Sequence, residues 1–157
     1  MSRIRGSAVR VALPSAAVLL AVWSIAHATQ APQPSDEARF KKLDAGPKTI
    51  DVSKYPPEQQ QAYKLFQTKC SSCHAIARGI GTEMVLPGDW ERYVKRMMHK
   101  PNSGIGSEEG RSLYRFMVYD AAARKADALR KALAALPVEE KAAAVDKVKA
   151  INPAFAP

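Results

Sequence analysis

The stretch YPPEQQQAYKLFQTKCSSCH, residues 55–74, decides how this sequence folds. It opens with two prolines, which the first turn of a helix tolerates, and with Glu58, whose carboxylate suits the positive end of a helix. Ala62, Leu65 and Phe66 then follow at the i, i+3, i+4 spacing of an apolar helix face. The pattern predicts a helix that begins at the prolines and runs directly into CSSCH.

The end of this stretch is a C-x-x-C-H sequence, the pattern of c-type haem attachment. The thiols of Cys70 and Cys73 lie about one helical turn apart, so each can form a thioether with one vinyl group on a haem edge. His74 follows directly and offers an imidazole nitrogen to the iron. The motif therefore predicts one covalently attached haem, with Cys70, Cys73 and His74 as its binding residues.

Two other interpretations of a C-x-x-C pair are a redox dithiol and half of a zinc site. A zinc site needs two more ligands, but the chain has no other cysteine and, after residue 28, His99 as its one other histidine. A redox dithiol of the thioredoxin type requires a βαβ setting, whereas the patterns along this chain are helical. Both alternatives are therefore less favoured than haem.

The rest of the chain also has helical patterns. A second helix is expected from Asp89 and a third from Ser107, both good helix caps. Residues 122–136 can continue the third helix, and residues 138–150 form a further Ala/Lys-rich helix after Pro137. No segment alternates convincingly like a strand. The predicted fold is all-α, with about three core helices around one haem and a helical C-terminal extension.

The N-terminal region has the pattern of a secretory signal peptide over residues 1–28. Three arginines precede the apolar run of residues 11–25, and Ala26-His27-Ala28 offers a cleavage site. The run is shorter than the ~20 residues that a membrane span prefers. We therefore expect export to the periplasm, with membrane attachment only if the segment is retained as an anchor. Residues 29–54, polar and rich in proline, are expected to form a linker or surface arm.

The charge of the chain is strongly basic. Its 24 basic and 15 acidic residues give a formal net charge of +9, and loss of the three arginines in residues 1–28 leaves 21 basic residues and a charge of +6. A basic surface suits redox protein partners with an acidic docking surface. The basic residues are not interleaved with aromatic ones, so no nucleic-acid partner is expected.

From residue 55 to 120 the sequence resembles the class I, mitochondrial-type, monohaem c-type cytochrome superfamily. The resemblance rests on the helix that enters CSSCH, a middle helix from Asp89-Trp90 and a last helix with Leu113, Tyr114 and Phe116. It implies that the first and last helices cross around the haem, that residues 55–121 form the cytochrome c domain, and that His74 is the proximal ligand. Residues 122–157 lie outside it, as a solvated helical extension or a docking segment for a partner complex.

The distal ligand is where this sequence departs from the family pattern. The family places a methionine in the loop before the last helix, but the loop KPNSGIG, residues 100–106, has none. Trp90, Val94 and Met97 recur at i, i+4 and i+7 on one face of the middle helix, which predicts that Trp90 contacts the haem and Met97 ligates the iron. The alternatives to Met97 are a sixth coordination position that is left open, or one of four other ligands: Met98, His99, Met84 and Met117.

Arg78, four residues after His74, is predicted to bind a haem propionate through a two-pronged guanidinium contact, with a solvated surface arginine as the alternative. The sequence offers no second catalytic group beside the haem. It therefore predicts a protein that transfers single electrons, either soluble or as the haem subunit of an oxidoreductase, rather than an enzyme by itself. The missing loop methionine keeps a second function open, a haem-based ligand sensor with an open or displaceable sixth position.

Overall fold

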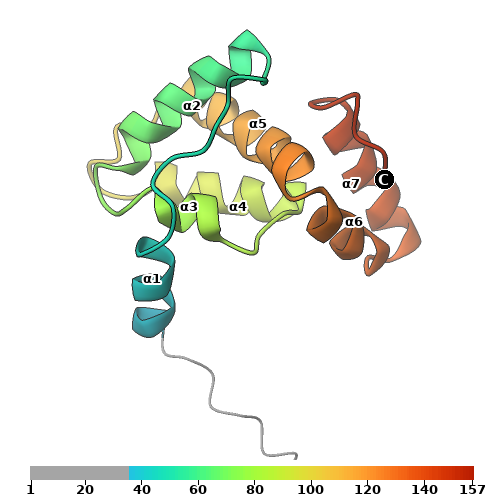
Figure 1. Ribbon diagram of the computed structural model, residues 1–157, viewed down its shortest axis with the longest axis horizontal. Coiled ribbons are helices and arrows are strands. Elements are labelled where there is room, and N and C mark those ends of the chain that lie inside the picture. Colours follow the sequence, from blue (N-terminus) through green and yellow to red (C-terminus); the bar gives the residue numbers. More distant parts are fainter. Residues whose placement is uncertain (1–35) are drawn as a thin grey trace, which may run out of the picture. The chain divides into compact units, whose positions relative to one another are not determined.

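The computed structural model describes residues 36–157, which form seven helices and no strand (Figure 1). The all-α prediction is thus confirmed for this part of the chain. The predicted signal peptide, residues 1–28, lies outside the described residues. The helices are α1 (Asp36–Asp44), α2 (Pro57–Cys70), α3 (Ala77–Gly81), α4 (Pro87–Met98), α5 (Ser107–Arg124), α6 (Ala126–Ala134) and α7 (Val138–Lys149). Among residues 36–157, none of these helices combines the length and the apolar character that crossing a bilayer requires.

Three helices, α2, α4 and α5, build the part of the core that positions the site, with α5 packed against both others. Phe66 of α2 and Phe116 of α5 are almost fully buried, and their ring centroids lie 5.5 Å apart. Trp90 and Val94 bury the inner face of α4. Burial of these aromatic side chains contributes to the apolar core that holds the three helices together.

The short helix α3 follows the CSSCH turn and is not among the helices that the sequence predicted. Its Gly79 lies against the ring of Phe66 from α2: a Cβ atom there would lie 3.1 Å from two ring carbons of Phe66. Gly79 and Gly81 therefore do not prevent a short helix here. The absence of a side chain at Gly79 leaves room for the Phe66 ring, while α3 itself packs on α1.

Helix α1 lies within residues 29–54, where the sequence analysis expected a linker or surface arm. None of its residues is buried, and its acidic first turn and basic last turn suit the helix dipole. Asp44 accepts a hydrogen bond of 2.9 Å from Nε of Arg78, and the guanidinium of Arg78 lies 4.4 Å from the centroid of the Phe40 ring. These contacts hold α1 against α3.

The C-terminal region begins with a break that the apolar pattern did not predict. α5 ends at Arg124 and α6 starts at Ala126, because Lys125 leaves the helical conformation at φ −120° and ψ 32°. Nζ of Lys125 donates a hydrogen bond of 2.6 Å to the carbonyl of Thr82. The chain then turns into α6 and α7, whose Leu129 and Val148 are fully buried. The extension therefore shares one continuous core with the helices that precede it.

Candidate functional site

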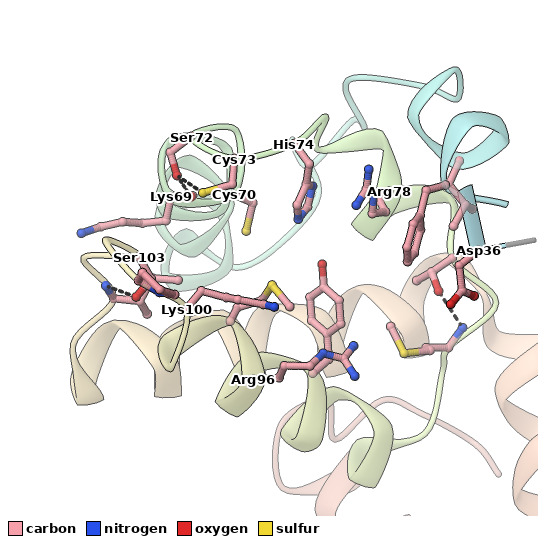
Figure 2. Close-up of a pocket in the computed structure, with 18 of the residues that line it drawn as sticks. Asp36, Lys69, Cys70, Ser72, Cys73, His74, Arg78, Arg96, Lys100 and Ser103 are labelled. Atoms are coloured by element: carbon pink, nitrogen blue, oxygen red, sulfur yellow. Dashed lines mark hydrogen bonds between the residues drawn. The ribbon is translucent and has the colours of Figure 1, made fainter. Parts of the chain in front are cut away.

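A cavity of about 610 Å³ opens next to the CSSCH turn (Figure 2). Its walls are α1, the end of α2 with the CSSCH turn, α3, α4 and the loops on either side of α4. The volume lies in the usual range of small-molecule and cofactor sites, ~300–1,000 Å³. Because it lies beside the CSSCH turn, this cavity is the candidate functional site.

Cys70, Cys73 and His74 all line this cavity. Cys70 is the last residue of α2 and is half-buried, while Cys73 is exposed in the turn that follows, and both thiols are free. In Figure 2 the sulfur of Cys70 and the ring of His74 point into the same space. The helix end thus presents two sulfur atoms and one imidazole to a single cavity.

The imidazole of His74 is oriented by its neighbour. Nδ1 lies 3.0 Å from the carbonyl oxygen of Ala75, a distance at which an Nδ1–H group donates a hydrogen bond to that oxygen. Nε2 then carries the free lone pair, and a backbone carbonyl that fixes the tautomer in this way is typical of histidines that ligate metals.

The protonation of Cys70 bears on the other interpretations of the motif. Burial, and secondly the nearby Cys73, raise the pKa of the Cys70 thiol to about 12. The sulfur is therefore neutral at pH 7 and a poor nucleophile, which is unlike a reactive redox dithiol. Among residues 36–157 no group of three His, Cys, Asp or Glu side chains is placed to hold a metal ion, so the cysteine pair has no further ligands of these types for zinc.

The structure separates the candidates for the distal ligand. Met97 of α4 lines the cavity, and so does Met84 from the loop before α4. The side chain of Met98 packs instead towards Gly110 of α5, and Met117 is buried in the core. His99 is exposed, outside the cavity wall, with Nδ1 2.6 Å from the carbonyl of Lys95. Met97 and Met84 are therefore the two methionines that share a cavity with His74.

Trp90, the predicted haem contact, does not line the cavity. It is only 2% exposed and packs in the core, outside the cavity lining, edge-on to Tyr93 at 5.8 Å between ring centroids. Its indole Nε1 has no hydrogen-bond partner within the part of the chain that the structure describes. Tyr93, which was not among the predicted site residues, lines the cavity instead. Its place four residues before Met97, one helical turn away, is the signal that could have found it.

Arg78 lines the cavity, but its guanidinium already has a carboxylate partner. It donates hydrogen bonds from two nitrogen atoms to the two carboxylate oxygens of Asp44 on α1. These hydrogen bonds hold the pKa of Asp44 below its ordinary value. The predicted propionate contact is therefore in competition with α1, and Arg78 is not a freely solvated side chain.

The cavity wall is rich in positive charge. Five cationic side chains line it against one carboxylate, that of Asp36; they are Arg39, Lys69, Arg78, Arg96 and Lys100. Lys69 also forms an ion pair of 2.9 Å with Glu109 of α5. An excess of cations around one opening favours an anionic ligand or an acidic docking partner.

Comparison of the chain with protein-family models, with curated proteins and with solved structures finds no match. The assignment of a function therefore depends on the residues and geometry of this cavity.

Proposed function

We propose that this chain is an exported monohaem c-type cytochrome of the class I, mitochondrial type, which carries single electrons between redox partners. One observation carries the proposal: Cys70, Cys73 and His74 open on one cavity, and Met97 lies on its wall. These donors fit haem c, because the cysteine sulfurs become uncharged thioethers and a neutral sulfur suits the half-buried position of Cys70. An imidazole and a thioether are the axial ligands of carrier cytochromes.

Each of the site residues has a defined part in this proposal. Cys70 and Cys73 hold the cofactor covalently at the end of α2, so an exported protein cannot lose it. His74 presents Nε2 to the iron, and the carbonyl of Ala75 keeps its ring in that orientation. Met97 provides the sixth ligand from α4. The bound haem supplies the one-electron couple of its iron.

The cationic side chains around the cavity provide the docking charge. Lys69, Arg96 and Lys100 lie on its wall and attract an acidic partner surface, an attraction that weakens as salt rises. The carrier is either soluble in the periplasm or the haem subunit of an oxidoreductase complex. Export depends on the predicted signal peptide in residues 1–28.

A second function is favoured by the presence of two methionines, Met97 and Met84, on the cavity wall. A sixth ligand that can be exchanged or withdrawn is the property of a haem-based sensor, which binds a small gaseous ligand at the iron. Carbon monoxide distinguishes the two functions, because a carrier with both axial positions occupied binds it poorly.

The experiment that tests the proposal is expression of the full chain in a bacterium with a cytochrome c maturation system. We expect the intact mass to include one haem that denaturation does not remove, and a low-spin spectrum with little response to carbon monoxide. Cys73→Ser should weaken or abolish attachment, and Ser71→Ala, in the same exposed turn, should not. Wild-type protein without covalent haem contradicts the proposal, and rapid carbon monoxide binding favours the sensor.

A further inference from the structure

A second hollow, of about 630 Å³, lies between α4, α5 and α7, and the cavity at CSSCH plays no part in it. We refer to it as the α4–α5–α7 groove. Val94, Gly110 and Ile151 on its wall are buried, and Met98 is half-buried beside them. The Met98 side chain lies directly over Gly110, so a Cβ atom at this position would force the flexible methionine to move. The groove therefore has an apolar floor, part of which the C-terminal extension supplies.

The rim of the groove is cationic. Lys95, Arg111, Arg115 and Lys147 line it together with one carboxylate, that of Glu91. Two ammonium groups share this carboxylate, since Nζ of Lys95 lies 2.7 Å and Nζ of Lys147 lies 3.5 Å from its oxygens. The rim thus carries more positive charge than its single carboxylate neutralises.

The two arginines on the rim form ion pairs with carboxylates that do not line the groove. Arg111 pairs with Glu108, and Arg115 lies 3.6 Å from Glu58, with both side chains of the latter pair about half exposed. Exposed ion pairs of this kind contribute little to stability. Their arginines are therefore available to an anion that enters the groove.

Tyr114 adds a polar group to the apolar wall. Its side chain is half-buried, packs against the core and lines the groove. A phenol hydroxyl can donate to a carboxylate oxygen. The groove thus combines an apolar floor, a hydroxyl donor and an excess of cations in a volume that suits a small molecule.

We propose that the α4–α5–α7 groove binds a single-chain anionic amphiphile of the fatty-acid type. The alkyl chain lies on Val94, Met98 and Ile151, where removal of its methylene groups from water is favourable. The carboxylate lies among the rim cations, and Lys147 of the extension is one of them. This inference does not depend on the proposed function, because no residue of the groove belongs to the CSSCH cavity.

The test is a calorimetric titration of the full protein with dodecanoate below its micellar concentration. We expect saturable binding of one molecule that weakens as salt rises, and much weaker binding of dodecyltrimethylammonium, which has the opposite charge. The double variant Arg115→Gln/Lys147→Gln should lose about tenfold in affinity, because two charge-assisted contacts are removed. Lys149→Gln, exposed on α7 outside the groove, is its control.

A second variant fills the groove instead of changing its charge. Ala150 is exposed and lines the groove, so Ala150→Trp should abolish dodecanoate binding, whereas Ala143→Trp, exposed on α7 outside it, should bind like the wild type. Circular dichroism checks that both variants fold. Three results overturn the proposal: no saturable binding, equal binding of the cationic amphiphile, or unchanged binding by a folded Ala150→Trp. The absorption spectrum of the haem band reports separately on the proposed function.

Discussion

The two hollows of this protein have nearly the same volume but very different walls. Both carry more cations than carboxylates, but the cavity at CSSCH, about 610 Å³, also presents two thiols, an imidazole and the sulfur of Met97, whereas the groove, about 630 Å³, presents Met98 and neither a thiol nor an imidazole. Both use α4, and these adjacent methionines go to different hollows because successive helical residues are about 100° apart. The side chains that line a hollow, and not its volume, therefore indicate which kind of ligand it can bind.

The strongest test of this difference is to remove the imidazole. His74→Ala should eliminate the low-spin spectrum expected of the proposed haem, because the cavity offers no second histidine. His99→Ala is the matched control, since His99 is exposed and outside the cavity. Absorption spectra of the oxidised and reduced proteins give the answer. If the spectrum of His99→Ala changed as much as that of His74→Ala, the assignment of the imidazole ligand to the cavity would be contradicted.

Substitution of the adjacent residues Met97 and Met98 tests whether one side chain belongs to the cavity and the other to the groove. Met97→Ala should remove the weak far-red band of a methionine–ferric iron bond and increase carbon monoxide binding. Met98→Ala should leave that band unchanged, because its side chain faces Gly110. The outcome that contradicts this is loss of the band in Met98→Ala. Persistence of the band in Met97→Ala, followed by its loss in Met84→Ala, would reassign the ligand to the other methionine of the cavity.

Substitutions in the C-terminal helices test whether the cavity region and the groove region unfold together. Leu129 is fully buried, so Leu129→Ala should lower the free energy of unfolding by ~2–5 kcal/mol in a denaturant titration. Val138→Ala, at a position that is 84% exposed, should change it by less than ~0.5 kcal/mol. Coincident transitions followed by circular dichroism and by the haem absorption would indicate one cooperative unit. Two separate transitions would instead divide the groove region from the cavity region.

Lys125, at the break between α5 and α6, gives a smaller, pH-dependent effect. Burial, and secondly Arg124, lower the pKa of its ammonium group to about 8, while the unfolded chain keeps a value near ~10.4. Between these values the unfolded state holds the additional proton, so this group makes the folded state more stable as the pH rises.

The measurement is the free energy of unfolding at several pH values from 7.5 to ~9.5, below the ordinary pKa of tyrosine. Lys125→Met should reduce the rise with pH, and Lys131→Met, exposed on α6, should keep the wild-type slope. An unchanged slope in Lys125→Met would mean that its ammonium group is not desolvated in the folded state.

The smallest expected effect concerns the α1 wall of the cavity. Asp44→Asn removes the charge that pairs with Arg78, so amide hydrogen exchange in residues 36–44 should become faster while that of α5 remains unchanged. In the wild type the pair is complete above the ordinary pKa of aspartate and is lost as the pH falls through the lowered pKa of Asp44. Glu37→Gln, exposed on the same helix, is the control. Equal exchange in all three proteins would show that other contacts hold α1.

Periodicity and motif predicted much of the helical layout because both are local properties. The helix that ends at Cys70, the helix around Met97 and the helix from Ser107 all lie where their apolar spacing placed them. Helices α1 and α3 were not predicted, since α1 buries no residue and α3 depends on the contact between Gly79 and Phe66. Short helices of this kind form because of their packing partners, which spacing does not reveal.

By itself the sequence determined the all-α class, the order of the main helices and the group of two thiols and one imidazole at residues 70–74. Only the tertiary structure decided which side chains share a space with that group. It brought Tyr93 to the cavity and buried Trp90, it separated Met97 from Met98, and it paired Arg78 with Asp44. The physical reason is that helical spacing defines a face of a helix, whereas the elements packed around that face determine which of its residues remain open to a ligand.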